Sequence, residues 1–134
     1  MNLASDFYTN VLEYKGKLLI RGVANGQSYL SRINYQPTLF VPTKDKTKHQ
    51  TLDGRYVAPK KFDSISKAKY FVDQYKSIPE YKIYGMNRYQ YQYIASHYKD
   101  EVKWNKDYIK IFTLDIETTC DAGFPDIENP KETI

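Results

Sequence analysis

The acidic residues Asp115 and Glu117 are the pair in this sequence whose spacing is best suited to metal chemistry. They follow residues 108–114, a β-branched and aromatic run that predicts a strand. Because alternate residues of a strand point to the same face, we expect both carboxylates to project together. Such a pair requires a cation between its charges, and Mg²⁺ or Mn²⁺ prefers these oxygen ligands. In two-metal sites the ions activate water and stabilise the leaving oxygen of a phosphodiester.

The same Asp-x-Glu spacing is also typical of a solvated strand edge or a turn, and spacing alone does not separate these interpretations from a metal site. The neighbouring residues favour the metal site. Residues 112–119 read FTLDIETT, and a Gly-Phe-Pro step follows at 123–125. This segment resembles the first exonuclease motif of the family B DNA polymerases, in which Asp115 and Glu117 match the two motif carboxylates.

The resemblance is to the T4-like bacteriophage polymerases in particular, and it extends over nearly the whole chain. The matching stretches occur in the same order and at similar spacing: Phe7-Tyr8, residues 35–42 (YQPTLFVP), Tyr84-Gly85-Met86, Trp104 and residues 108–111. The opening stretch alone is unspecific, whereas the ordered set is characteristic of those polymerases.

For the fold, the resemblance implies a polymerase N-terminal domain over residues 1–107, part of it built like an RNA-recognition module. Residues 108–134 would then begin a ribonuclease-H-like 3′–5′ exonuclease domain, with residues 108–114 as its first strand. In the parent enzyme Asp115 and Glu117 would be catalytic residues that hold Mg²⁺ or Mn²⁺.

The later exonuclease carboxylates, the palm aspartates and the fingers lysines of that family have no counterpart in this sequence. We therefore expect an N-terminal fragment of a viral DNA-directed DNA polymerase, or the first piece of a split one. It would bind nucleic acid or act as a scaffold for the larger polymerase, with no activity alone and weak metal binding or none. The resemblance implies DNA or RNA and the rest of the polymerase as partners, in the host cytoplasm. An exposed edge of the strand 108–114 would also permit self-association.

The composition fits one globular domain that carries an uneven charge. The chain has 134 residues, of which 41% are hydrophobic, enough for a core. No apolar run approaches the ~18 residues of a membrane span. Residues 1–110 carry 19 Lys and Arg against 10 Asp and Glu, whereas residues 111–134 carry one against six. The basic part can face nucleic-acid phosphates, or it can be an ordinary lysine-rich surface.

Five lysines are candidate phosphate contacts because they flank a polar loop and a strand end: Lys44, Lys46, Lys48, Lys60 and Lys61. The 14 tyrosines fit either base stacking on a sheet surface or a tyrosine-rich core. The lone histidines His49 and His97 are predicted to be surface residues, since neither has zinc-ligand spacing. A stand-alone RNA- or single-stranded-DNA-binding module is therefore the alternative to a polymerase fragment, and a scaffold without nucleic-acid affinity is the third interpretation.

The expected elements describe an α+β domain. Strands are expected at residues 7–14, 18–23, 27–33, 55–58 and 81–85, with extended chain at 34–42. Asn25-Gly26 predicts a tight hairpin. A first helix should start after Asp63 or Ser64. A second helix, capped by Asn87, should turn Tyr91, Ile94, Ala95 and Tyr98 inward. Together these elements predict an antiparallel β-meander followed by a sheet with two helices packed on one face.

Overall fold

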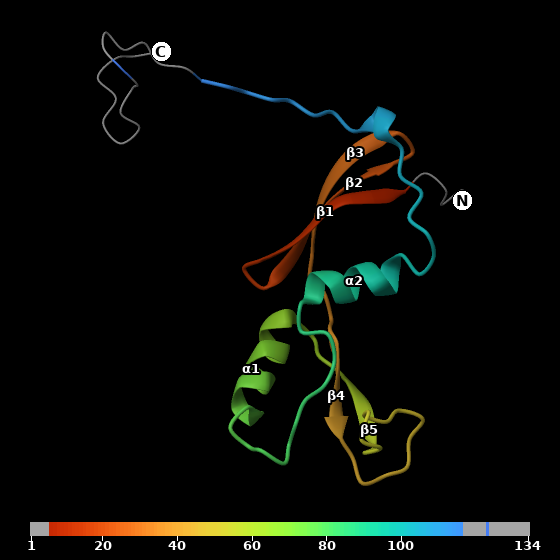
Figure 1. The fold of residues 1–134 in the computed structure, drawn as a ribbon, viewed down its shortest axis with the longest axis vertical. Helices are drawn as coiled ribbons and strands as arrows, with labels where there is room; N and C mark the ends of the chain where they lie inside the picture. The colour runs from red at the N-terminus through yellow and green to blue at the C-terminus, as the bar shows by residue number, and fades with distance from the viewer. Residues whose placement is uncertain (1–5, 117–122, 124–134) are drawn as a thin grey trace.

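The computed structural model describes residues 6–116 and Gly123, and it contains two separate antiparallel sheets and two α-helices. The three-stranded sheet and the two-stranded sheet occupy opposite ends of the body, and α2 lies between them (Figure 1). The α+β class and the antiparallel pairing are therefore as expected from the sequence. None of the helices in the described ranges is long and apolar enough to cross a membrane.

The first sheet is a meander in which β1 (Phe7–Tyr14), β2 (Lys17–Ala24) and β3 (Gln27–Ile33) pair in chain order. Both hairpins turn through two residues with positive φ, Lys15-Gly16 and Asn25-Gly26. Such turns match the right-handed twist of the strands that they connect. The prediction of these three strands and of the Asn25-Gly26 turn is confirmed.

The second sheet pairs β4 (Thr38–Pro42) with β5 (Val57–Lys61). The strand expected at residues 55–58 begins at Val57 instead, because Tyr56 is taken up by an isolated bridge to Gln50 that closes the connecting loop. The prediction of a strand at residues 81–85 was wrong. In the structure this segment forms one antiparallel bridge, between Tyr84 and Phe40. Gly85, with φ of 118°, turns the chain away from β4 directly after that bridge.

The first helix, α1 (Ile65–Tyr75), starts as predicted at Ser64, whose Oγ accepts the Lys67 N–H at 3.2 Å. It buries Ile65 and Ala68 against the core. The second helix, α2 (Tyr89–His97), begins after Arg88 with no side-chain cap, so the cap expected at Asn87 was wrong.

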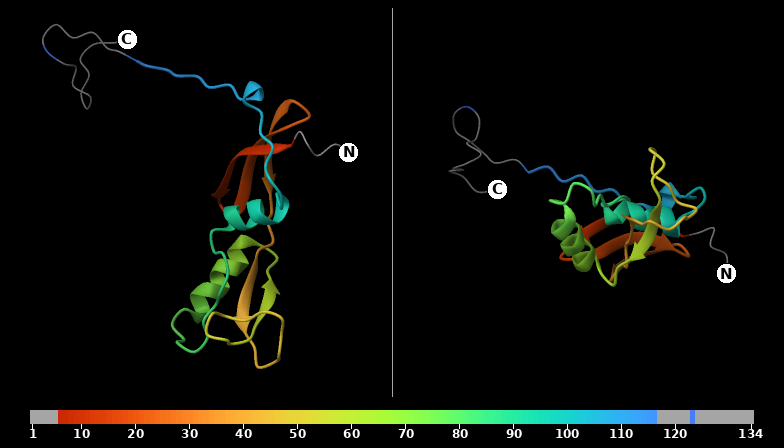
Figure 2. Two further views of the ribbon diagram at one scale, coloured as in Figure 1. Left: turned by 45° about the vertical axis from the view of Figure 1, so that its right-hand side comes forward. Right: turned by 90° about the horizontal axis from the view of Figure 1, so that it is seen from below.

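The inner face of α2 differs in part from the sequence prediction, which is confirmed at Ile94 and wrong at Tyr91. Tyr89 is 1% exposed, and Tyr93 and Ile94 pack beside the same core, whereas Tyr91 is 48% exposed. Tyr89 and Tyr93 share a face because they are four residues apart, and Tyr91 lies between them on the opposite side. The helices also do not share one sheet face: α2 lies against β1, whereas α1 lies beside β4 and β5 (Figure 2).

One hydrophobic core connects both sheets and both helices. Its buried members are Val11, Leu18, Ile20, Leu39, Phe62, Ile65, Ala68 and Tyr89. Because β2, β4, α1 and α2 each contribute side chains to this cluster, the two sheets are parts of one folded unit.

The Gln92 side chain fixes the position of β4. Its Oε1 accepts the Thr38 N–H at 2.7 Å and the Tyr35 hydroxyl at 3.0 Å. Its Nε2 donates to the carbonyls of Thr38 at 2.8 Å and Met86 at 3.1 Å. Thr38 and Phe40 present their backbone groups on the same edge of β4, and Tyr84 pairs with Phe40 there. One amide side chain and one bridging residue thus cover the edge that β5 leaves open.

After α2 the chain forms the 3-10 helix η2 (Lys106–Tyr108) and then continues without strand pairing through Ile116. The strand predicted at residues 108–114 is therefore not formed among the described residues. A strand requires a hydrogen-bonded neighbour, and none of the described residues pairs with this segment. The segment projects from the folded body (Figure 1). As a result Ile111, Phe112 and Leu114 are 84–88% exposed, which is unusual for apolar side chains.

We predict that replacing Gln92 with Leu lowers the free energy of unfolding by about 1–3 kcal/mol, because the backbone groups of Thr38 lose their partners while remaining partly buried. Urea denaturation followed by circular dichroism measures the change. The matched control is Gln74→Leu on the exposed side of α1, for which we expect a change within about 0.5 kcal/mol. Equal effects of the two substitutions would contradict this role of Gln92.

Candidate nucleic-acid interface

The predicted metal site is only partly within the described residues. Asp115 is exposed on the unpaired segment that follows η2, and Glu117 lies outside the described residues. Within residues 6–116 and Gly123, no three His, Cys, Asp or Glu side chains are grouped closely enough to hold a metal ion. Asp115 and Glu117 as metal ligands thus stay a prediction.

The five predicted phosphate contacts fall into two groups. Lys44, Lys46 and Lys48 are exposed on the loop that joins β4 to β5, and we call residues 43–56 the β4–β5 loop. Lys60 and Lys61 lie at the other end of β5, where Lys61 pairs with Thr38. At about 3.3 Å per residue, four residues of strand separate Lys61 from the loop end at Val57 by roughly 13 Å. The structure therefore does not gather all five lysines at one place.

Lys60 has an intramolecular contact of its own. Its Nζ lies 5.6 Å from the centre of the Phe62 ring and 5.4 Å from that of Phe71. These distances are within the range of cation–π attraction. Lys61, as the next residue of the strand, points to the opposite face. The loop lysines are consequently the better candidates for phosphate contacts.

Hydrogen bonds from two threonines organise the β4–β5 loop. Thr47 Oγ1 donates to the Val57 carbonyl at 2.7 Å and accepts the His49 N–H at 3.1 Å. Thr51 Oγ1 accepts the Arg55 N–H at 3.1 Å and donates to the Asp53 carboxylate. The loop therefore carries its lysines on a hydrogen-bonded frame.

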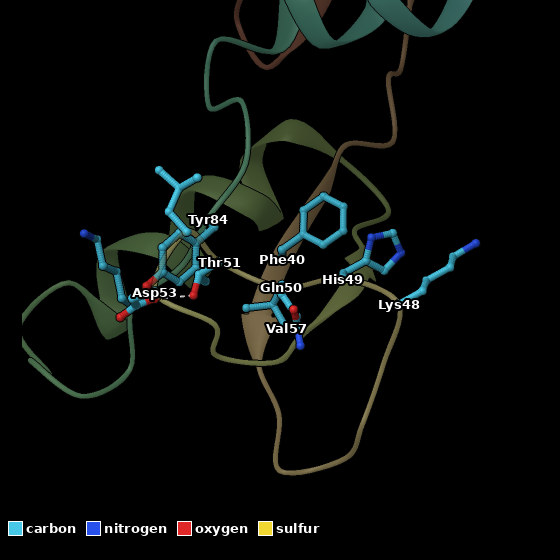
Figure 3. Close-up of a pocket in the computed structure, with 10 residues that line it drawn as sticks. Phe40, Lys48, His49, Gln50, Thr51, Asp53, Val57 and Tyr84 are labelled. Atoms are coloured by element: carbon cyan, nitrogen blue, oxygen red, sulfur yellow. Dashed lines mark hydrogen bonds between the residues drawn. The ribbon is translucent and has the colours of Figure 1, made fainter.

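A hollow of about 640 Å³ opens between this loop and β4. Phe40, His49, Val57 and Tyr84 contribute its apolar and aromatic lining (Figure 3). The Phe40 and His49 rings are in contact, with centres 5.1 Å apart. Sequence reasoning assigned no role to Phe40 or Tyr84, although both fall in the stretches that resemble the phage polymerases. Their proximity depends on the single bridge that joins them, which periodicity does not reveal.

Positively charged side chains outnumber negatively charged ones in the lining of the hollow. Lys48 and Lys82 line it, together with one carboxylate, Asp53. The pKa of Asp53 is lowered, chiefly by the hydrogen bond from Thr51 and also by the nearby Arg55, so this carboxyl is ionised at neutral pH. Arg55 Nε lies 3.1 Å from Asp53 and offsets its charge. Lys82 also lowers the pKa of Asp53, so Lys48, Lys82 and Arg55 together outnumber this carboxylate by two charges.

Six of the 14 tyrosines pack against one another in pairs. Ring contacts join Tyr8 to Tyr98, Tyr35 to Tyr93 and Tyr75 to Tyr81, with centres 4.4–5.9 Å apart. Burial raises the pKa of Tyr98, whose hydroxyl reaches Asp6 at 3.5 Å. A tyrosine-rich core and rim therefore account for much of the unusual composition, as the second of the two sequence-based interpretations predicts.

Two curated proteins are similar to this chain over most of its length, while no protein-family model matches it. The chain is 28% identical over 122 residues to the DNA-directed DNA polymerase of Enterobacteria phage T4. It is 26% identical over 132 residues to the DNA-directed DNA polymerase of Escherichia phage RB69. These alignments cover 90% and 96% of the chain. The resemblance to the T4-like phage DNA polymerases is confirmed.

The chain spans only 13% and 14% of the length of these two phage polymerases.

We predict that replacing Thr47 with Val lowers the free energy of unfolding by roughly 1–3 kcal/mol, because the Val57 carbonyl and the His49 N–H lose the hydroxyl that they share. Urea denaturation gives the change in unfolding free energy. Thr113→Val on the exposed segment after η2 is the isosteric control and should change it by no more than about 0.5 kcal/mol. A Thr47→Val protein as stable as the control would show that the loop frame contributes little.

Proposed function

We propose that this chain is the N-terminal part of a family B DNA polymerase that replicates viral DNA and also proofreads as a 3′–5′ exonuclease. The observation that carries the proposal is the similarity to two phage DNA-directed DNA polymerases over at least nine-tenths of the chain. In this proposal residues 1–107 form the polymerase N-terminal domain, part of it related to an RNA-recognition module. The remainder of the polymerase is its main protein partner.

Residues 108–134 begin the exonuclease domain in this proposal. The support is the segment from Ile109 to Ile116, whose β-branched and aromatic side chains are exposed and whose backbone has no strand partner among the described residues. Such a segment is suited to becoming a strand when a ribonuclease-H-like sheet supplies its neighbour. The unpaired backbone of this segment could also pair with the same segment of a second copy, which would make the isolated chain self-associate.

Asp115 and Glu117 are the proposed catalytic metal ligands of the parent enzyme. Carboxylate oxygens are a fitting donor set for Mg²⁺ or Mn²⁺, which in such sites activate water for attack on a phosphodiester. Two carboxylates fill only part of an octahedral shell, so further ligands must come from later parts of the polymerase. Alone, this chain is expected to hold such an ion weakly.

The body of the chain binds single-stranded DNA or RNA through the β4–β5 loop in this proposal. Lys44, Lys46 and Lys48 are exposed there, with Lys60 and Lys61 as a second, separate basic group on β5. Phosphate contacts of this kind give affinity without sequence preference and release counterions. A stand-alone RNA- or single-stranded-DNA-binding module is the second candidate, because the loop and the aromatic hollow lie entirely within the body.

The salt dependence of binding tests the role of the loop. We expect the triple variant Lys44→Gln, Lys46→Gln and Lys48→Gln to bind a labelled single-stranded oligonucleotide more weakly, with the slope of log affinity against log salt reduced by up to about 2. Fluorescence anisotropy across a salt series measures both quantities. The control variant replaces Lys17, Lys67 and Lys76 with Gln, so its net charge changes by the same amount as that of the loop variant. A loop variant that behaves like this control would refute the proposed contacts.

We expect the 134-residue chain to show neither nucleotide incorporation nor 3′–5′ degradation of a labelled primer–template in Mg²⁺ or Mn²⁺. The reason is that two carboxylates cannot by themselves position two ions, a substrate and a water. Denaturing gel electrophoresis resolves both reactions. Reproducible degradation that disappears in Asp115→Ala would overturn this expectation and assign a complete nuclease site to the chain.

A further inference from the structure

We propose that the hollow between β4 and the β4–β5 loop is a nucleotide-binding site that holds one base of a single strand against Phe40 and Tyr84. This inference rests on the proposed binding of single-stranded nucleic acid by the body of the chain, and it adds a base contact to the phosphate contacts of the loop. The lining of aromatic rings with lysines is the observation that carries it.

Phe40 and Tyr84 form the aromatic floor of this site. Their backbones exchange two hydrogen bonds, Phe40 N–H to Tyr84 O at 2.8 Å and Tyr84 N–H to Phe40 O at 2.9 Å. Residues paired in this way project side chains to the same face, with Cβ atoms about 5 Å apart. Both side chains are only half-buried, so part of each ring is open to a ligand. Figure 3 shows both residues facing the hollow, with His49 next to Phe40.

One cationic group lies beside the Tyr84 ring, namely Lys82, which lines the hollow from the segment that leads to Tyr84. Lys48 belongs to the loop wall of the hollow, and its side chain points outward (Figure 3). The Lys82 Nζ lies 5.5 Å from the centre of the Tyr84 ring. A ligand that uses all these groups needs a flat π-system and a negative charge within a few ångströms of it. A nucleotide unit has both, whereas inorganic phosphate lacks the ring and an apolar molecule lacks the charge.

The size and the construction of the hollow also suit a nucleotide unit. Its volume of about 640 Å³ is within the range of small-molecule sites, roughly 300–1,000 Å³. Thr47 and Thr51 hold its loop wall through hydrogen bonds, and Gln92 holds the strand that carries Phe40. Little ordering is then required on binding, which favours affinity. Stacking on rings tolerates any base, so the site should show little sequence preference.

The test compares two labelled single strands of equal length, one with bases and one with an abasic sugar–phosphate backbone, by fluorescence anisotropy with the full chain. We expect the strand with bases to bind about tenfold more tightly, equivalent to about 1.4 kcal/mol of stacking. Tyr84→Ala should abolish that preference, and Tyr84→Phe should retain it because the ring remains. Tyr70→Ala, which removes an exposed tyrosine of α1 outside the hollow, should leave the preference unchanged.

The possible outcomes distinguish the base-binding site from the proposed binding of single-stranded nucleic acid by the β4–β5 loop. Salt-dependent binding with equal affinity for both strands would overturn the base site and leave the loop contacts intact. The same holds for a base preference that survives Tyr84→Ala, because the base would then stack elsewhere. Absence of binding to both strands at low salt would overturn the base site and the proposed nucleic-acid binding together. A Lys82→Gln variant should weaken binding of both strands, whereas Lys17→Gln should not.

Discussion

The hydrogen bonding of β4 is the constraint on which the remaining arrangement depends. β5 satisfies one edge of this short strand, and the other edge is satisfied by the Gln92 amide at Thr38 and the Tyr84 backbone at Phe40. Without these partners the outer edge would carry unpaired, partly buried backbone groups. With them, α2 and the segment before it are held against β4, and Leu39 is directed into the core that the two sheets share.

This arrangement gives hydrogen-bonding and aromatic side chains at the rim a part in holding the core together. The core contains buried Tyr89, and ring contacts between tyrosines extend around it. Tyrosine combines a large apolar ring with a hydroxyl that needs a partner when it is buried. Tyr35 donates to Gln92, so the amide that closes the strand edge also satisfies a tyrosine at the rim of the core. Packing and hydrogen bonding are therefore coupled at the same side chains.

The elements governed by local chemistry were predictable from the sequence, and those governed by long-range pairing were not. Asn25-Gly26 fixes its hairpin because both residues adopt positive φ, and Ser64 caps α1 through its own neighbours. The bridge between Phe40 and Tyr84 and the covering of Thr38 by Gln92 join residues more than forty positions apart, and no periodic pattern encodes them. The strand expected at residues 108–114 is absent from the described residues for the same reason, since a β-branched and aromatic run favours a strand but supplies no neighbour to pair with. Among the candidate site residues, the loop lysines could be found from composition, whereas the aromatic hollow required the fold.

The ring of Tyr108 lies over Gly26 at the β2–β3 turn, where a Cβ would meet it at 3.3 Å. This contact anchors the departing chain at the far end of the body from the β4–β5 loop (Figure 1). The β4–β5 loop and the chain that departs after Tyr108 therefore lie at opposite ends of the body, with the folded core between them. Because Tyr108 packs where a side chain at position 26 would lie, the β2–β3 turn helps to set the direction in which residues 109–116 leave the body.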